Sequence, residues 1–211
     1  MGNNRDPRCR QCRREGAKLF LKGEKCVRHC TLDKEKRRKP PGQHGNTFIQ
    51  KKLTEYGTQL REKQKLRRVY RVLEGQFRGY MSEADRRRGV TGETLLQLLE
   101  TRLDNVVYRL GLAASRAQAR QMVSHRFFRV NDRRVNIASY QVRPGDVIKV
   151  DESKSRAGVV REARDKAHTR GLPDWLQFDL QNMVGTVLSV PTRAQIDTAV
   201  QEQLIVEFYS R

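Results

Sequence analysis

Apolar residues recur at helical spacing in the middle of this 211-residue chain, and the pattern predicts two consecutive helices. The first is expected over residues 94–112, because one face is apolar and Gly111 would stop the helix. That apolar face consists of Leu95, Leu99, Leu103, Val106, Val107 and Leu110. The second helix is expected to begin at Ser115, since Ser115 and Gln118 have the spacing of a capping box. Its inner stripe would be formed by Ala119, Met122 and Val123.

Short apolar runs after these helices predict strands. A strand over residues 127–130 is expected to pair with one over 135–137 across Asn131 and Asp132, because Asn and Asp tolerate positive φ in tight turns. A further strand is expected over 147–150. The pattern therefore predicts two helices packed on a small antiparallel sheet. Two more strands, with Trp175 in the core, are expected at 175–178 and 186–190.

The first fifty residues contain few apolar positions, so residues 1–47 are expected to form an extended arm that ends in a loop rich in Pro and Gly, residues 40–45. Residues 52–88 show helical spacing again. Their apolar face would include Leu53, Tyr56, Leu60, Leu66, Val69 and Leu73. Their outer face would carry Arg61, Lys63, Lys65, Arg67 and Arg68. The tail is expected to form a last helix that packs against these helices through Val200, Leu204, Ile205 and Phe208.

The charge of the chain is strongly positive. Lys and Arg number 44 against 24 Asp and Glu, which gives a formal net charge of +20. Residues 1–52 hold 16 basic and 5 acidic side chains, whereas residues 151–211 hold 8 and 9. The excess positive charges repel one another in the free protein. A polyanion, above all nucleic acid, is therefore the expected partner. The chain has no apolar stretch near the ~20 residues that cross a bilayer and no secretory apolar start, so we expect a cytoplasmic protein that does not bind membranes.

Four cysteines lie in the first thirty residues, and the rest of the chain has none. Cys9 and Cys12 form a C-x2-C pair, and Cys26 and Cys30 form a second close pair, which is a spacing typical of a tetrahedral zinc site. In a reducing compartment such a cluster favours metal ligation over disulfides. The sequence therefore predicts one structural Zn²⁺ that orders the arm, with an iron–sulfur cluster or unliganded thiols as alternatives.

Polar side chains project from the predicted helix that begins at Ser115. Arg116 and Arg120 lie one turn apart on the face assigned to the outside, with Gln121 and His125 on flanking faces. Arginine reaches phosphates, and the other two donors reach sugars or base edges, which favours RNA binding. The alternative for His125 is a helix-terminal position favoured by the macrodipole.

Two arginines of the preceding helix have alternative roles. Arg102 and Arg109 would either pair with Asp104 or Glu100 or contact RNA. The sequence favours neither alternative.

Several segments together resemble one known family. Residues 101–111, 115–121 and 130–135 resemble the RNA-binding module of the bacterial small-subunit ribosomal protein S4 family. Segments outside that module, at 40–45, 60–68 and 202–210, resemble the same family. The gap between the second pair of cysteines is slightly shorter than in the zinc-bearing members, so His29 is an alternative to Cys30 as the fourth ligand.

The resemblance implies an α+β fold in which one domain interrupts another. A helical domain of residues 48–94 would be completed by a C-terminal helix of residues 193–211, and the RNA-binding module with its antiparallel sheet would be inserted as residues 95–192. The arm of residues 1–47 would carry the zinc knuckle.

The resemblance also implies a function. Members of the family are structural constituents of the small ribosomal subunit that bind the 5′ domain of its rRNA, nucleate assembly of the 30S body and influence accuracy beside the path by which mRNA enters. Neighbouring small-subunit proteins numbered three, five and twelve would be partners. The candidate RNA contacts are Arg10, Arg13, Arg14, Lys22, Gln43, His44, Arg61, Lys63, Lys65, Arg67, Arg68, Arg116, Arg120, Gln121, His125, Asn131, Arg133 and Arg134.

Two other classes of protein compete with this prediction. An RNA-modifying enzyme with the same module would need a further catalytic domain of roughly 150 residues, but only 61 residues follow Val150. The sequence also shows no phosphate-binding Gly-rich loop and no nucleophile elbow, so no catalytic residue is expected. A zinc-ribbon transcription factor would concentrate its basic residues on one recognition element, whereas here they spread over three segments.

Overall fold

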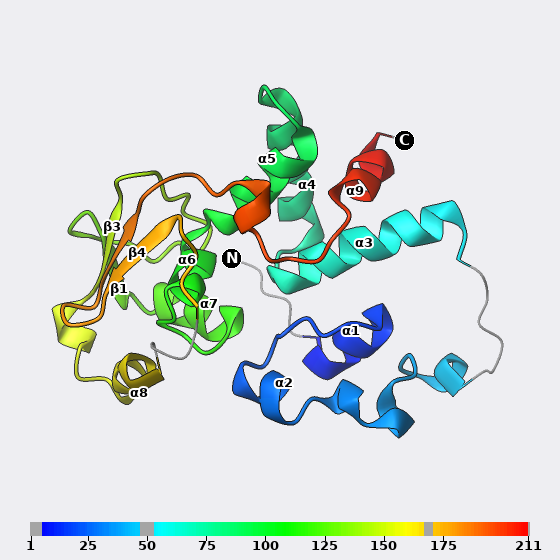
Figure 1. The fold of residues 1–211 in the computed structure, drawn as a ribbon, viewed down its shortest axis with the longest axis horizontal. Coiled ribbons are helices and arrows are strands. Elements are labelled where there is room, and N and C mark those ends of the chain that lie inside the picture. The colour runs from blue at the N-terminus through cyan, green and yellow to red at the C-terminus, as the bar shows by residue number, and fades with distance from the viewer. Residues whose placement is uncertain (1–5, 47–52, 167–170, 211) are drawn as a thin grey trace. The chain divides into compact units, whose positions relative to one another are not determined.

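The computed structural model describes residues 6–46, 53–166 and 171–210. Helices and one small antiparallel sheet give the chain an α+β fold (Figure 1). Across the described residues, no helix has both the length and the apolar character needed to span a membrane. The chain divides into two compact units.

Unit 1 combines Met1–Leu95 with Thr198–Arg211. The arm contributes the short helices α1 (Arg8–Glu15), α2 (Glu24–Arg28), η1 (Thr31–Asp33), η2 (Glu35–Arg37) and η3 (Gln43–Asn46). The remainder of unit 1 is built on α3 (Glu55–Val69), α4 (Glu74–Arg86) and α9 (Glu202–Tyr209). Helix α5 (Thr91–Glu100) begins in unit 1 and ends in unit 2.

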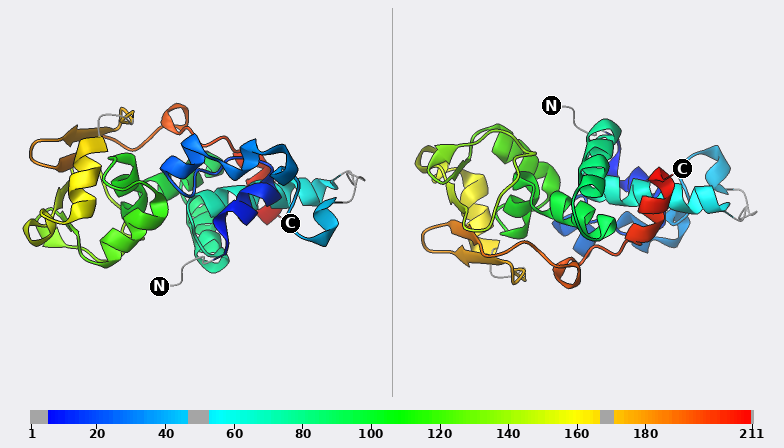
Figure 2. Two further views of the ribbon diagram at one scale, coloured as in Figure 1. Left: turned by 90° about the horizontal axis from the view of Figure 1, so that it is seen from below. Right: turned by 90° about the horizontal axis from the view of Figure 1, so that it is seen from above.

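Helix α9 packs against α3, which is the packing expected for the apolar tail (Figure 1 and Figure 2). Val200 and Ile205 are buried, and the ring centroid of Phe208 lies 5.5 Å from that of Tyr56. The hydroxyl group of Tyr209 donates a hydrogen bond to Oε1 of Glu74 at 2.8 Å. The C-terminal helix is therefore held to unit 1 by apolar, aromatic and polar contacts.

The apolar face predicted for this region is partly wrong. The side chains of Leu53, Tyr56 and Leu73 are 60%, 50% and 39% exposed. Leu66 and Val69 are buried as predicted, and the other buried positions of α3 are the polar residues Gln59 and Lys63. Gln59 and Lys63 are covered because side chains of α9 lie over them: Gln59 donates to Glu207 at 3.1 Å, and Nζ of Lys63 lies 4.8 Å from the ring centroid of Phe208.

Unit 2 is Leu96–Asp197 and contains the sheet. Its helices are α6 (Leu103–Arg109), α7 (Arg116–Ser124), η4 (Glu152–Lys154), α8 (Gly158–Lys166) and η6 (Arg193–Gln195). Its strands are β1 (Phe128–Val130), β2 (Arg133–Arg134), β3 (Val147–Val150), β4 (Leu176–Asp179) and β5 (Val184–Val187). The strand order is β2-β1-β3-β5-β4, and every pair is antiparallel. A single core joins α6 and α7 to the sheet and includes Trp175, as predicted.

The long helix predicted over residues 94–112 is wrong in one respect, because the structure breaks it into α5 and α6. Arg102 has extended backbone with ψ of 136°. At the break, the N–H groups of Leu103 and Asp104 donate to the carbonyl groups of Tyr140 and Ala138 at 2.8 and 3.2 Å. Backbone hydrogen bonds to the 138–142 segment therefore replace those that would have continued the helix.

Local sequence signals predicted the end of α6 and the start of α7 more accurately. Gly111 has φ of 79° and follows α6, and the N–H of Leu112 donates to the carbonyl of Val107, as in a Schellman motif. Ser115 Oγ accepts from the N–H of Gln118 at 3.3 Å. The Gln118 side chain differs from the predicted capping box, because it accepts from the N–H of Ala114 instead of Ser115.

The hairpin turn is confirmed, since Asn131 and Asp132 have φ of 48° and 64°. Its second strand is Arg133–Arg134, so the prediction of 135–137 was two residues late. The strand expected at 175–178 is Leu176–Asp179, so that prediction was one residue early, whereas the strand expected at 186–190 is Val184–Val187, so that prediction was two to three residues late.

Candidate nucleic-acid interface

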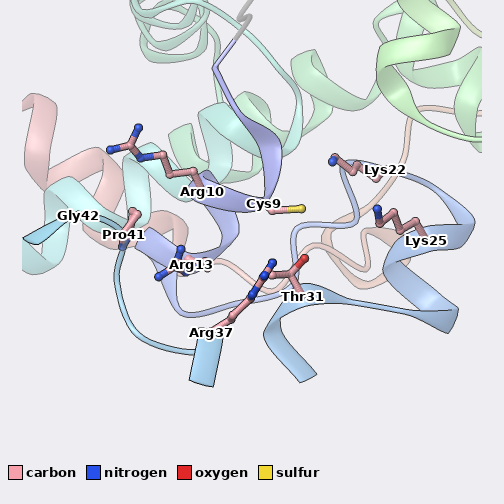
Figure 3. A pocket seen from close by; sticks show the side chains of 9 residues that line it. All are labelled: Cys9, Arg10, Arg13, Lys22, Lys25, Thr31, Arg37, Pro41 and Gly42. Carbon is pink, nitrogen blue, oxygen red and sulfur yellow. The ribbon is translucent and has the colours of Figure 1, made fainter. Parts of the chain in front are cut away.

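An open cavity in the arm collects basic side chains from distant positions of the sequence (Figure 3). Its volume is about 520 Å³. We call it the cationic cavity, and its lining residues are Cys9, Arg10, Arg13, Lys22, Lys25, Thr31, Arg37, Pro41 and Gly42. In Figure 3, Lys22 and Lys25 lie on one side of Cys9, and Arg13 and Pro41 lie on the other. Five of these nine described residues are cationic and none is acidic.

The cations of this cavity carry uncompensated charge. Arg10, Lys22, Lys25 and Arg37 are exposed. Within the described part of the chain, none of the four forms an ion pair with a carboxylate group. Clustered charges of one sign create a local potential that attracts ions of the opposite sign, so the cavity is suited to an anionic ligand.

Hydrogen bonds to backbone carbonyl groups fix one wall of the cavity. Nε of Arg13 donates to the carbonyl of Lys39 at 2.9 Å, and its terminal nitrogen donates to the carbonyl of Pro40 at 3.4 Å. A Cβ atom added to Gly45 would overlap the carbonyl oxygen of Pro40, so only glycine permits this close approach. The N–H of Gly45 also donates to the carbonyl of Gly42 at 3.1 Å. The loop that carries Pro41 and Gly42 is therefore held against α1.

A second, smaller cavity brings the four cysteines together. It is lined by all four, by His29 and by six further residues. Cys12, Cys26 and Cys30 are buried, Cys9 is half-buried, and all four thiols are free of disulfides. Cys26 Sγ accepts a hydrogen bond from the backbone N–H of Lys22 at 3.3 Å. As the side chains stand, no group of three or more His, Cys, Asp or Glu residues among those described is arranged to hold a metal ion.

The thiols of this cavity have different environments. A hydrogen bond with Thr31, together with the charges of Lys22 and Lys25, lowers the pKa of the Cys9 thiol. Burial raises the pKa of the Cys12 and Cys26 thiols. Metal ligation requires thiolates, and the lysines that would favour them also line the cationic cavity.

The basic cluster predicted on α3 is largely neutralised within the protein. Arg61 and Arg68 both pair with Glu15 of α1, the former at 3.3 Å. Lys65 pairs with Glu62, and Arg67 lies 3.6 Å from Glu74. Lys63 was assigned to the outer face, and this was wrong, because it is 4% exposed and pairs with Glu74 at 2.8 Å. The charges of α3 therefore serve mainly to join α1, α3 and α4.

The arginines of α7 also differ from the prediction. Arg120 was expected outside but is 6% exposed, and its guanidinium lies 3.6 Å from Asp104 of α6. Nε of Arg116 donates to Oδ1 of Asn105 at 2.7 Å, and its guanidinium lies 4.6 Å from the ring centroid of Tyr108. Both arginines face inward because α6 packs against this side of α7. Gln121 and His125 remain exposed and available to a ligand.

The two arginines with alternative roles form ion pairs. Arg102 is fully buried and donates twice to Asp104, at 3.0 and 2.7 Å. Arg109 donates to Glu100 at 3.0 and 2.7 Å and to Asp197 at 2.9 and 2.6 Å. One guanidinium group thus holds residues near both ends of unit 2.

The hairpin of β1 and β2 presents further basic side chains. Arg134 donates to Asp151 at 2.8 and 3.2 Å, and Arg129 donates to the same carboxylate at 2.8 Å. The hydrogen bonds from Arg134, Ser153 and Arg129 hold the pKa of the Asp151 carboxyl well below its usual range. Arg133 is exposed and, among described residues, has no carboxylate partner.

Asn131 does not contribute a free amide to this hairpin. Its side chain donates to Asp146 at 2.7 Å and accepts from the N–H of Val147 at 2.9 Å, so it stabilises the turn.

Arg14 and Gln43, two candidate RNA contacts of the arm, are exposed outside the cationic cavity. The side chain of His44 lies outside the described part of the structure.

Sequence reasoning missed Lys25 and Arg37 of the cationic cavity and Arg129 of the hairpin. Lys25 directly precedes Cys26, and that position beside an expected ligand was a signal that could have identified it. Arg37 stands in the basic run of residues 34–39, where no local pattern separates one cation from its neighbours.

Comparisons with known proteins give matches along almost the whole chain. Residues 3–100 match the family described as ribosomal protein S4/S9 N-terminal domain, and residues 101–148 match the S4 domain. The chain is 55% identical over 212 residues to a small ribosomal subunit protein uS4 from Natranaerobius thermophilus, with all of both chains covered. It is 59% identical over 206 residues to a uS4 protein from Dictyoglomus turgidum, with 97% of each chain covered. A uS4 protein from Thiobacillus denitrificans is 53% identical over 212 residues, again with both chains fully covered.

Proposed function

The chain belongs to the uS4 family of small ribosomal subunit proteins, and from this premise we propose that it binds small-subunit rRNA through the exposed cations of its N-terminal arm and through the hairpin around Arg133. As a member of this family it is a structural constituent of the small subunit that binds rRNA, and it is not an enzyme.

The observation that carries the proposal is the distribution of ion pairs. The arginines and lysines of α3 face carboxylate groups of the same chain, and those of α7 face α6. The exposed cations of the cavity and Arg133 have no such partners among the described residues. Phosphate groups would supply the missing negative charge, and the release of their counterions would favour binding.

We propose further that the RNA partner is the 5′ domain of the small-subunit rRNA and that binding nucleates assembly of the 30S body. A protein that binds only the folded form of an RNA junction shifts the population of the RNA toward that form. Position beside the path by which mRNA enters, an influence on accuracy, and contacts with the small-subunit proteins numbered three, five and twelve belong to the same proposal.

Binding measurements with the purified full chain test this function. We expect tight binding to the 5′ domain of small-subunit rRNA, weaker binding to duplex DNA of equal length, and co-sedimentation with 30S particles at moderate salt. Equal affinity for the DNA would indicate a protein that recognises only charge, and it would favour the DNA-binding alternative.

We also propose that the four cysteines of the smaller cavity bind one structural Zn²⁺, with His29 as an alternative to Cys30. The donors suit the ion, because cysteine side chains from α1 and from the α2 region already line one cavity. The sulfur atoms would have to converge on that cavity for ligation. Bound zinc would cross-link two segments that have little apolar surface of their own, and structural zinc contributes about 10–16 kcal/mol of apparent binding energy.

Elemental analysis of protein purified without added metal tests the zinc proposal. About one zinc per chain is expected, whereas iron with inorganic sulfide would indicate a cluster, and four reactive thiols without either metal would contradict ligation. Tight zinc binding by Cys30→Ser, together with its loss in His29→Ala, would assign the fourth ligand to His29.

A further inference from the structure

We infer that the cationic cavity is a site for phosphate groups of the RNA backbone, with Lys25 and Arg37 as its main phosphate-binding residues. This inference rests on the proposed function and deepens it, because it names both the place on the protein and the chemical group of the RNA. Neither residue belongs to the sites predicted from the sequence.

The cations converge on the cavity from four different segments. Arg10 and Arg13 come from α1, Lys22 from the loop before α2, Lys25 from α2 and Arg37 from η2. A volume of about 520 Å³ is in the range of cavities that enclose a whole small ligand, so it exceeds the needs of a single ion. The cavity is therefore suited to a short stretch of backbone with successive phosphates.

The charge of the cavity distinguishes it from the other basic surfaces of the arm and α3. Glu15 neutralises Arg61 and Arg68, and Asp33 pairs with Lys18 at 2.7 Å. No acidic residue lines the cationic cavity among the residues described. The ammonium group of Lys25 can therefore face an anionic oxygen as a point charge, and the guanidinium group of Arg37 can do so as a planar fork.

Contacts within the protein hold the wall of the cavity. Arg13 is a positioning residue, because its two bonds to the carbonyl groups of Lys39 and Pro40 hold the loop that forms one wall. The close approach of Gly45 to Pro40 secures the same loop. A preformed wall lowers the ordering cost of binding, which favours a defined site over a diffuse charged surface.

A matched pair of double variants distinguishes a defined phosphate site from a diffuse charged surface. Lys25→Gln with Arg37→Gln removes two charges from the cavity. Arg28→Gln with Lys36→Gln removes two charges from exposed positions of the same arm that do not line it. Affinity for small-subunit rRNA would be measured by filter binding between 50 and 200 mM salt, after circular dichroism has shown that both variants fold.

The cavity variant should lose the salt dependence of two phosphate contacts. Each contact contributes roughly 0.7–0.9 to the slope of log affinity against log salt, so the slope should fall by about 1.4–1.8. Over this fourfold salt range, the wild-type protein should then lose about tenfold more affinity than the cavity variant. The control variant should keep a slope close to that of the wild-type protein.

Lysine acetylation of the unmodified protein gives a second readout that needs no variant. Bound rRNA should protect Lys22 and Lys25 from acetic anhydride and leave Lys36 reactive. Inorganic phosphate, compared with chloride at equal ionic strength, shows whether a free anion occupies the same place. Protection by phosphate without protection by rRNA would mean a free-anion site and would overturn the inference.

Equal losses in the two double variants would also overturn it, because the arm would then bind through diffuse charge while the proposed function still held. Absence of rRNA binding by the wild-type protein would instead refute the proposed function itself. The two failures are therefore distinguishable.

Discussion

Two aspartates of unit 2 make similar bonds to arginine but differ in burial, and this difference predicts very different contributions to stability. The Asp104 side chain is 6% exposed and accepts two bonds from the fully buried Arg102, with Arg120 also within 3.6 Å. Asp104→Asn keeps the shape of the side chain and removes the carboxylate that both guanidinium groups face. Breaking a buried pair in this way costs about 3–5 kcal/mol. Since whole domains are stable by only about 5–15 kcal/mol, the variant should lose about a fifth or more of the stability of unit 2.

Asp197→Asn is the matched control. Asp197 also accepts two bonds from one arginine, Arg109, at 2.6 and 2.9 Å, but its side chain is 75% exposed. Exposed ion pairs contribute about 0.2–1 kcal/mol because water and salt screen them. The bond lengths alone would predict equal effects, so the two variants isolate the influence of burial.

The chain provides its own probe for this measurement. It contains a single tryptophan, Trp175, which is 1% exposed in the core of unit 2. Urea unfolding followed by tryptophan fluorescence therefore reports on this unit. With a slope of about 2 kcal/mol per molar urea, the midpoint should fall by about 1.5–2.5 M for Asp104→Asn and by less than about 0.5 M for Asp197→Asn. Similar shifts for both variants, or a loss below about 1 kcal/mol for Asp104→Asn, would refute the argument from burial.

Three further results are expected. Gly45→Ala places a Cβ atom against the carbonyl of Pro40, so rRNA affinity should fall about tenfold while the tryptophan-detected midpoint stays constant; undiminished affinity would show that the loop wall is dispensable. Deletion of residues 200–211 uncovers α3, so amide hydrogen exchange in α3 should accelerate while the tryptophan midpoint is kept, and unchanged exchange would contradict the packing described. The pKa of Asp151 is depressed mainly by Arg134, so its stabilising effect is present above about pH 4 and is lost as the pH falls toward the folded-state pKa. Asp151→Asn should therefore flatten the acid limb of the stability curve, and identical acid limbs in both proteins would exclude this role.

The features predicted correctly from the sequence depend on residues close together in the chain. Ser115 caps α7, Gly111 follows α6 with a positive φ, and Asn131 and Asp132 form the hairpin turn. Each of these signals acts through backbone conformation within a few residues, so no tertiary information is needed to recognise it.

The errors arose where distant segments decide the outcome. Periodicity predicts one helix through Arg102, but hydrogen bonds to the 138–142 segment stabilise a break there. Lys63 and Arg120 were assigned to outer faces because they are charged, yet Glu74 and Asp104 supply carboxylates that allow both to be buried. The cationic cavity could not be predicted either, because its lining comes from six segments that only the folded arm brings together.

The bonds of Arg109 to both Glu100 and Asp197 have a consequence for the order of folding. They hold the beginning and the end of a segment of about 100 residues within reach of one guanidinium group. Before unit 2 folds, the two parts of unit 1 are joined by a flexible chain of that length. Once it has folded, they are joined by the equivalent of a loop of roughly six residues. The closure entropy scales with the logarithm of loop length, so prior folding of unit 2 lowers the cost of assembling unit 1 by about 2.5 kcal/mol. Chain connectivity alone thus favours a sequence of events in which the inserted unit forms first and α9 docks on α3 last.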